Sequence, residues 1–294
     1  MKIGVFGATG VIGSALVPVL AEDHDVVAVS RHADRAPRDG VQTAVADVTD
    51  AAAVRSALEG VEVVYYLVHS LGSPDFSERD RDGAATVARE AERAGVTQIV
   101  YLGGLGDDSP DLSPHLRSRI ETATALAFGS VPVTTLRSAV VVGRGSAGFE
   151  TIVALVDRLP VMVAPRWVST PTQPIALSDV VRYLAAVAGR EEAQNETYDV
   201  GGPDVMTYRE MIERIAEICG KRRVILEVPV LSPRLSSYWL HLVTPVRAAV
   251  ARPLVEGLRN PTVAQDERIR RLHPLPLTPF DDAARAALGA RGRR

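Results

Sequence analysis

The chain has 294 residues, of which 46% are hydrophobic, and a formal net charge of −3 at pH 7. This length suffices for one large domain, or for one domain with a smaller attachment, and the small acidic excess gives no general attraction to phosphate backbones, so nucleic-acid binding is not expected. A single cysteine precludes an intrachain disulfide, and the opening MKIGVFGATG lacks a signal-peptide pattern, so we expect a cytoplasmic protein.

Short β-branched runs alternate with longer helical patterns over the first 200 residues. We expect strands at residues 2–6, 25–30, 41–46, 61–68, 97–103, 131–137 and 196–200. Helices are expected at residues 11–22, 50–60, 77–95 and 114–129. Regular alternation of strand and helix is typical of βαβ units, so the sequence predicts a doubly wound α/β fold with a parallel sheet covered on both faces.

The chain changes character after Val200, where proline-rich connections such as VPVLSPRL and LHPLPLTPF appear. No further strand–helix series is expected there. We therefore expect residues 1–142, completed by residues 175–202, to form the α/β core. Residues 143–174 and 203–294 are expected to form a smaller substrate-binding C-terminal part.

The first expected strand runs directly into the turn GATGVIG. Gly7 permits a tight exit from the strand, Gly10 lets the backbone approach a pyrophosphate, and Gly13 lets helix and sheet pack closely. The helix N-terminus that follows favours an anion. A strand before these glycines and a helix after them predict a dinucleotide site. Further cofactor contacts are expected from Thr9, Val11 and Ile12.

The second strand ends in VVAVSRHADR, without the acidic residue that would bind an adenosine ribose in an NAD site. Ser30 and Arg31 instead offer a hydroxyl and a permanent cation for a 2′-phosphate, and Arg35 is a second candidate. NADP(H) is therefore favoured over NAD(H). The alternative is that Arg31 stacks on the adenine or points to water.

Asp47 follows the third expected strand, within ADVTD. At that position its carboxylate can accept a hydrogen bond from the adenine amino group. The competing interpretation makes Asp47 or Thr49 the N-cap of the helix at residues 50–60.

These motifs resemble the short-chain dehydrogenase/reductase superfamily, in its extended or atypical branch. The resemblance covers nearly the whole chain through GATGVIG, ADVTD, LVHS, IVYLGGLG, TTLRSAVVVG, PIALSDVVRYL and YDVGGPDVMTYREMIERIAEICGK. The segments YLVHS, YLGGLG, LSPHLRSRIE and LVTPVR are similar to bacterial NAD(P)H-binding proteins near the NmrA-like proteins and the accessory nucleotide-binding subunit of respiratory complex I. The resemblance implies an NAD(P)-binding Rossmann fold. It also implies that the cofactor cleft is lined by Val48, Leu67, Val68 and His69.

Active members of this superfamily carry a Tyr-x-x-x-Lys pair on the helix after the fifth strand, and here the residues with that spacing are His115 and Arg119. The only lysines are Lys2 and Lys221, and no tyrosine precedes either by four residues. The usual pair is therefore absent. The usual serine is also missing, since the strand ends in Gly103-Gly104.

Residues 113–127 are expected to form a helix that presents His115 and Arg119 to the cofactor. Ser113 is the expected N-cap and Pro114 the first helical residue. On this phasing His115 and Arg119 lie along the margin of a buried stripe. The stripe is expected to comprise Leu116, Ile120, Ala123 and Ala127.

His115 is the candidate catalytic proton donor, and Arg119 is a candidate both for catalysis and for binding the nicotinamide ribose. Arginine can donate hydrogen bonds but cannot release a proton. The neighbouring Arg119 is expected to lower the His115 pKa from ~6.5, leaving mostly neutral imidazole at neutral pH. The alternative is a polar helix margin that orders the cofactor or a loop.

Other polar groups have competing interpretations. His69 and Tyr101 are rival proton donors, although strand alternation favours a core position for Tyr101. The resemblance places residues 137–140 along the nicotinamide. Arg166 and Trp167 are expected either to line a pocket wall, where they would pair an anion and an aromatic face, or to form a structural stack under the loop. Asp179 is expected to cap a helix.

No metal site is expected, because the histidines are scattered and there is no cysteine cluster. Ser146 in GRGSAG lacks the pattern of a hydrolase nucleophile. Residues 235–258 are interrupted by Pro245 and Pro253 and are not expected to span a membrane. There Trp239, Leu242, Val243 and Val246 share a face that suits a membrane surface, but a pocket lid or packing helix is favoured.

Two functions follow from these observations. The favoured one is an NADPH-dependent oxidoreductase that acts on a small carbonyl, quinone or enone, with a proton from His115 or from water. The alternative is an NADPH-binding redox sensor or assembly factor without turnover. The expected partner is a small-molecule substrate, and no oligomeric state is assigned.

Overall fold

The computed structural model describes residues 1–32, 41–70, 73, 75–106, 112–228 and 257–289. At its centre is a seven-stranded sheet with the order β11-β6-β5-β4-β1-β2-β3, and every adjacent pair is parallel. The strands are β1 (Lys2–Phe6), β2 (Asp25–Ser30), β3 (Gln42–Val45), β4 (Val63–Tyr66), β5 (Gln98–Gly104), β6 (Val133–Ser138) and β11 (Thr197–Val200). The predicted doubly wound α/β fold is confirmed.

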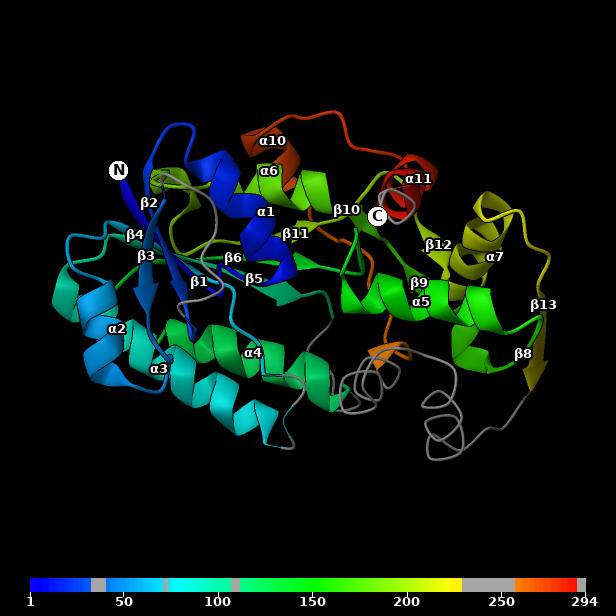
Figure 1. Ribbon diagram of the computed structural model, residues 1–294, viewed down its shortest axis with the longest axis horizontal. Helices are drawn as coiled ribbons and strands as arrows, with labels where there is room; N and C mark the ends of the chain where they lie inside the picture. Colours follow the sequence, from blue (N-terminus) through cyan, green and yellow to red (C-terminus); the bar gives the residue numbers. More distant parts are fainter. Residues whose placement is uncertain (33–40, 71–72, 74, 107–111, 229–256, 290–294) are drawn as a thin grey trace.

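Helices cover both faces of this sheet (Figure 1). One face carries α1 (Val11–Leu20) and α6 (Leu177–Ala186), and the other carries α2 (Ala51–Ala57), α3 (Phe76–Ala94) and α4 (Pro114–Leu126). Neighbouring side chains of a strand point to opposite faces, so Tyr65 joins the apolar cluster under α1 and α6, whereas Tyr66 joins the cluster under α2, α3 and α4. Both rings are fully buried, as a sheet with two covered faces requires.

A third apolar cluster lies beyond the end of the sheet (Figure 1). Its elements are α5 (Ala147–Arg158), β8 (Val161–Pro165), α7 (Tyr208–Ile218), β13 (Val224–Val228) and α11 (Phe280–Gly289). The strands β8 and β13 pair in parallel, with Val161 opposite Val224. The expectation that no further strand–helix series follows Val200 is therefore wrong, since α7 and β13 follow it in turn. The Thr207–Glu210 capping box starts α7, and its apolar face packs into this cluster.

Short elements connect the two parts. They are β7 (Val141–Val142), η2 (Arg166–Ser169), β9 (Pro171–Thr172), β10 (Ile175–Ala176), η3 (Glu191–Ala193), β12 (Met206–Thr207) and α10 (Arg268–Leu272). Strand β10 pairs with β7, and β12 pairs with β9. From α10, Ile269 packs into the cluster under α1 and α6, so part of residues 203–294 belongs to the α/β core.

Asp179 holds this returning segment in place. Its carboxylate accepts hydrogen bonds from the Thr278 backbone nitrogen at 2.7 Å and from the Thr278 hydroxyl at 3.1 Å. The N-cap of α6 is Ala176, so the expectation that Asp179 caps a helix is wrong. The carboxylate is almost fully buried. A buried carboxylate needs hydrogen-bond partners inside the protein, and Thr278 provides them.

Several expectations concern parts of the chain outside the described residues. Arg35 and almost all of residues 235–258 belong there, as do the side chains of Arg166 and Trp167. Among the helices that the structure describes, none combines the length and apolar character needed to cross a bilayer.

Gly13→Ala is expected to lower the free energy of unfolding. A Cβ at this position would lie 2.3 Å from the Gly7 carbonyl oxygen and 2.7 Å from the Ala8 Cα. Such overpacking costs about 1–3 kcal/mol, more than the roughly 1 kcal/mol that alanine gains over glycine in a helix. Urea unfolding measures the difference. The control is Gly289→Ala, where a Cβ would meet no heavy atom within 4 Å. Equal stability of both variants would contradict the expectation.

Candidate functional site

The strand order creates a topological switch point at the carboxyl edge of the sheet. From β1 the sheet continues through β2 and β3 on one side, and through β4, β5, β6 and β11 on the other. Helical connections therefore diverge between β1 and β4. Ligands of open α/β sheets bind at such a switch point.

The glycine turn brings three backbones together at this point. Gly7 has a φ of +86°, and a Cβ there would lie 2.8 Å from the Leu67 carbonyl oxygen. The Gly7 carbonyl accepts the Gly10 N–H at 2.9 Å, which closes the turn at the start of α1. Glycine is required at position 7 because a side chain would collide with the chain leaving β4.

The N-terminus of α1 has the features of an anion site. Its N-cap is Gly10, and no side chain caps the helix, so first-turn N–H groups lack intrahelical partners. A Cβ on Gly10 would meet only the Gly7 carbonyl oxygen, at 3.2 Å, and would occupy the space above the turn. Thr9 is exposed, and Val11 and Ile12 are half-buried. This cradle fits the pyrophosphate of a dinucleotide.

Ser30, Arg31 and Asp47 gather where β2 and β3 end. The Ser30 hydroxyl donates to the His32 carbonyl oxygen at 2.7 Å, and Arg31 is exposed. Hydrogen bonds from Thr49, at 3.0 Å from its backbone nitrogen and 2.7 Å from its hydroxyl, hold the pKa of the Asp47 carboxyl below its usual range. The Arg31 charge lowers that pKa further.

Neither Asp47 nor Thr49 caps the following helix. The N-cap of α2 is Asp50, whose carboxylate accepts the N–H groups of Ala52 at 2.9 Å and Ala53 at 3.2 Å. The capping alternative for Asp47 and Thr49 is therefore wrong. The predicted adenine contact of Asp47 stays a prediction.

Three apolar residues expected along the cleft differ in what they can offer a ligand. The Val48 side chain is buried against α3, close to Gly83, so only its backbone can face a cofactor. Leu67 and Val68 place their backbones against Gly7. The Leu67 N–H donates to the Phe6 carbonyl at 2.9 Å, which extends the parallel pairing of β1 and β4 up to the cleft.

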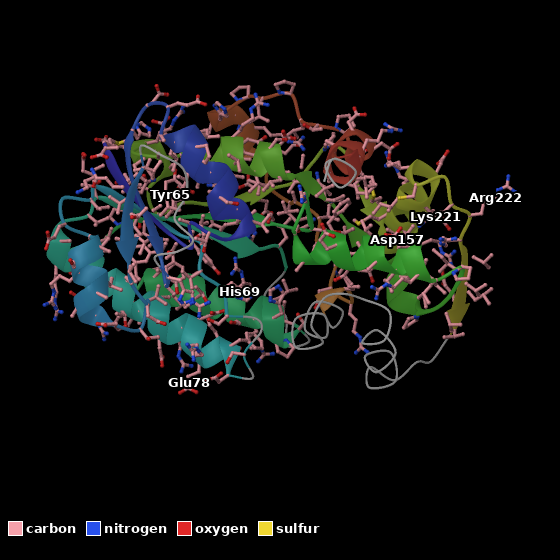
Figure 2. All side chains as sticks on the ribbon, viewed as in Figure 1. Tyr65, His69, Glu78, Asp157, Lys221 and Arg222 are labelled. Carbon is pink, nitrogen blue, oxygen red and sulfur yellow. The ribbon has the colours of Figure 1, made fainter. Side chains whose placement is uncertain are left out.

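His69 follows immediately and forms an ion-pair-like contact with a buried aspartate. Its Nδ1 lies 2.7 Å from the Asp80 Oδ2, and the Ser70 backbone nitrogen donates to the Asp80 Oδ1 at 2.8 Å. Asp80, on α3, is 1% exposed, whereas the His69 side chain is 24% exposed. Burial lowers the His69 pKa, and the hydrogen bond to Asp80 opposes that change. Figure 2 shows His69 between the sheet and helices α3 and α4.

Asp80 was not predicted from the sequence as a site residue, although a signal was present. The buried positions of α3 include Asp80, Gly83, Ala84, Val87 and Ala91. These positions follow the helical repeat of a core-facing stripe. An acidic residue on such a stripe must find partners inside the protein, and here its partners come from residues 69 and 70.

His115 lies against His69. Their ring centroids are 5.2 Å apart with a 40° angle between the planes, and the His115 Nδ1 is buried without a hydrogen-bond partner. Burial lowers the pKa of His115 to about 3, with smaller contributions from His69 and then Arg119. The expected direction of the shift is confirmed, and Arg119 does contribute, but burial is the larger cause.

Packing at Leu116 sets the rotation of α4. Ser113 caps the helix by accepting the Leu116 N–H at 3.2 Å, and Pro114 is its first residue, as predicted. Leu116 fits against the backbones of Gly104 and Gly106, where added Cβ atoms would lie 3.0 and 3.3 Å from its methyl carbons. The fully buried residues are Leu116, Ser118, Thr122 and Leu126. The predicted stripe is therefore wrong in part, since Ile120 and Ala123 are only half-buried and Ala127 is exposed.

This rotation turns Arg119 toward the sheet. Its Nη2 donates to the Leu102 carbonyl, and its guanidinium lies 5.1 Å from the centre of the Tyr101 ring. The Tyr101 hydroxyl donates to the Arg119 carbonyl at 3.1 Å. Burial raises the Tyr101 pKa, which makes this core tyrosine a weak proton donor. Ribose binding by Arg119 stays a prediction, and it relies on the other N–H groups of the guanidinium.

Arg137 forms an ion pair with Asp199 of the neighbouring strand β11. Its Nη2 lies 2.7 Å from the Oδ1 of buried Asp199, whose Oδ2 accepts the Gln265 N–H at 2.9 Å. The carbonyls of Ser138 and Val140 accept N–H groups from Leu105 and Ile175. Because these carbonyls already accept hydrogen bonds, they are less available for the expected backbone contacts with nicotinamide. Among the described residues, no group of three histidine, cysteine or acidic side chains is placed to hold a metal ion.

Residues 7–127 match the sequence profile of an NAD(P)H-binding family. They span the glycine turn, Asp47, His69 and the helix that carries His115. This part of the chain is therefore similar to an NAD(P)H-binding family. The match agrees with the dinucleotide site predicted from the glycine turn.

A reductase is among the proteins similar to this chain. The (4-alkanoyl-5-oxo-2,5-dihydrofuran-3-yl)methyl phosphate reductase of Streptomyces griseus is 26% identical over 220 residues, which are 74% of this chain and 73% of that protein. An uncharacterised protein of Mycobacterium tuberculosis is 28% identical over 239 residues, 81% of this chain. The chain spans about a quarter of that protein, 25% of its length.

A solved structure shares the fold over its whole length. The NADPH-dependent quinone oxidoreductase of Escherichia coli, determined with NADPH, superposes with a TM-score of 0.78 at 21% sequence identity. The match covers 98% of this chain and 100% of that one. The chain therefore shares the fold of that protein.

Acid is expected to destabilise the protein through His115. Its folded-state pKa of about 3 lies below the ~6.5 of an unfolded histidine, so only the unfolded state gains a proton as the pH falls from about 6.5. Stability is therefore lost below that pH, by at most about 1.4 kcal/mol per pH unit. His69, whose pKa is also lowered, acts in the same direction.

The measurement is urea unfolding at several pH values between 7.5 and 5 for the wild type and His115→Phe. The variant is expected to lose stability less steeply, because one buried group no longer titrates. Values at pH 7.5 serve as the internal reference. Parallel pH dependences in the two proteins would contradict the assignment.

Proposed function

We propose that the protein is an NADPH-dependent oxidoreductase that reduces a small carbonyl, quinone or enone without a Tyr–Lys pair. The observation that carries the proposal is the convergence of the uncapped α1 N-terminus with the polar groups that close the same crevice. The His69 and His115 rings lie 5.2 Å apart at the carboxyl edge of the sheet, where a reacting group would be delivered. The expected cofactor site at the α1 N-terminus and the titratable His69 and His115 thus lie at the same edge of the sheet.

Arg31 supports NADP(H) as the preferred cofactor. It is exposed at the end of β2, where a 2′-phosphate would lie, and β2 ends in Ser30 rather than in an acidic residue. A guanidinium forms stronger, better-directed bonds to phosphate than to a ribose hydroxyl. The Escherichia coli enzyme with the same fold is NADPH-dependent.

The activities of similar proteins support the substrate class. The Streptomyces griseus relative is a reductase of an oxo-dihydrofuran substituted by an alkanoyl group, and the Escherichia coli protein is a quinone oxidoreductase. Both substrates place a carbonyl in conjugation with a ring double bond. A small conjugated carbonyl compound is therefore the first substrate class to test.

When bound, NADPH supplies the hydride for the reduction. The residues of this chain bind and orient the reactants. The α1 N-terminus holds the pyrophosphate, Arg31 holds the 2′-phosphate, and Arg119 remains available to hydrogen-bond the ribose. Asp47 accepts from the adenine amino group.

A cofactor-binding protein without turnover is the second candidate. It is favoured by the position of Arg119, whose guanidinium donates to the Leu102 carbonyl and stacks on Tyr101. Arg119, which replaces the usual lysine, thus makes structural contacts with Leu102 and Tyr101. In this role NADPH binding would report the redox state of the cofactor pool.

Arg31→Ala is expected to weaken NADPH binding about 10- to 100-fold, because a hydrogen bond to a charged group contributes about 1.5–3 kcal/mol. NADH binding is expected to change little. Fluorescence titration with both cofactors measures the two Kd values. Arg285→Ala, on the distant helix α11, is the matched control. Equal weakening of NADPH and NADH binding would contradict a 2′-phosphate contact.

Turnover separates the two candidate functions. The wild type is expected to oxidise NADPH in the presence of 9,10-phenanthrenequinone or 2-cyclohexen-1-one, with NADPH consumption followed at 340 nm. Product analysis confirms reduction of the acceptor. NADPH binding without turnover on carbonyl, quinone and enone panels would overturn the oxidoreductase proposal in favour of the sensor.

A further inference from the structure

Asp80, His69 and His115 form a cluster of titratable groups at the carboxyl edge of the sheet, built from β4, α3 and α4. His69 follows β4, Asp80 lies on α3 and His115 on the first turn of α4. The groups that face the His69 ring are Asp80 from α3, and His115 and Arg119 from α4. None of the cofactor-binding contacts described above requires an aspartate buried behind the histidine.

We propose that His69 is the catalytic proton-transfer residue and that Asp80 is its positioning residue. The inference rests on the proposed reductase function and names the residue that completes it. In the reduction, the carbonyl carbon gains the hydride of NADPH and the carbonyl oxygen gains the proton of His69 Nε2. The products are the alcohol and NADP⁺, and water returns a proton to His69. In the reverse direction the bare Nε2 takes the alcohol proton.

The hydrogen bonds determine which His69 nitrogen does this work. The Asp80 carboxylate accepts the Ser70 N–H on Oδ1 at 2.8 Å and faces His69 Nδ1 with Oδ2 at 2.7 Å. An ionised carboxylate only accepts hydrogen bonds, so the facing Nδ1 carries the proton. Nε2 is therefore the nitrogen that exchanges a proton with substrate or water. The 24% exposure of the side chain gives water access to the ring, whereas Asp80 is sealed behind it.

His115 is less suited to donate a proton. Burial and the neighbouring His69 and Arg119 hold its pKa near 3, so it stays neutral throughout the physiological range. Its buried Nδ1 has no hydrogen-bond partner, and its ring packs against the His69 ring. A neutral neighbour allows His69 to become an imidazolium without facing a second positive imidazole.

The first test is the tautomer of His69, followed by ¹⁵N NMR of the free protein. Neutral wild-type His69 is expected to carry its proton on Nδ1. In Asp80→Asn the amide oxygen keeps the Ser70 N–H and the NH₂ group faces Nδ1, so the proton is expected to move to Nε2. His273→Gln, whose ring packs against Tyr183 on the other face of the sheet, is the control and leaves the His69 signals unchanged. A wild-type proton on Nε2, or no change in Asp80→Asn, overturns the proposal.

The second test is the rate of quinone reduction. His69→Gln is expected to lower kcat about 100-fold or more, the usual contribution of a positioned acid or base, while the NADPH Kd changes far less. The reduction rate of the wild type is expected to fall as the pH rises through the His69 pKa, and the remaining rate of His69→Gln is expected to lose that dependence. An undiminished rate in His69→Gln together with a rate lost in His115→Phe assigns the proton to His115 and overturns the proposal.

The two tests also separate this proposal from the proposed function. If the wild type binds NADPH but turns over neither 9,10-phenanthrenequinone nor 2-cyclohexen-1-one, the reductase function fails, and the proton-transfer role fails with it. The NMR result then still decides whether the Asp80–His69 pair exists in solution. If turnover is present and the tautomer is not as stated, the reductase function stands and the present proposal fails.

Discussion

Close backbone approach at the carboxyl edge of the sheet is the constraint on which the site depends. Gly7 lies against the Leu67 carbonyl, and Gly13 lies against Gly7 and Ala8, so that added Cβ atoms would fall within 3 Å of backbone. These contacts bring α1, β1 and β4 together at one point. Because nothing larger than hydrogen fits there, the α1 N-terminus and the residues that follow β4 can line the same crevice.

A second close approach positions the histidines. Leu116 packs against the bare backbones of Gly104 and Gly106 and thereby sets the rotation of α4. This rotation carries His115 to the His69 ring and turns Arg119 toward Tyr101. One packing contact thus places His115 beside His69 and Arg119 beside Tyr101. The electrostatics follow from the same contact, since burial is the main cause of the low His115 pKa.

Buried carboxylates connect the core with its additions. Asp179 holds Thr278, Asp199 holds Arg137 and Gln265, and Asp80 holds His69 and Ser70. Each carboxylate is 1–2% exposed, and an unpaired charge at such a depth would be costly. Asp179 and Asp199 secure the return of the C-terminal segment. Asp80 differs because its partner is itself titratable and partly open to water.

The sequence by itself determined the strand and helix order of the core, the glycine turn, and the absence of a Tyr–Lys pair, because these depend on local periodicity and on residue identity. Only the tertiary structure decided that Asp50 rather than Asp47 caps α2, that β13 pairs with β8, and that Arg119 donates to the Leu102 carbonyl. The Asp80–His69 pair joins residues 11 positions apart on different elements. Such contacts depend on how each helix is rotated against the sheet, and that rotation is set by side-chain packing between segments distant in sequence.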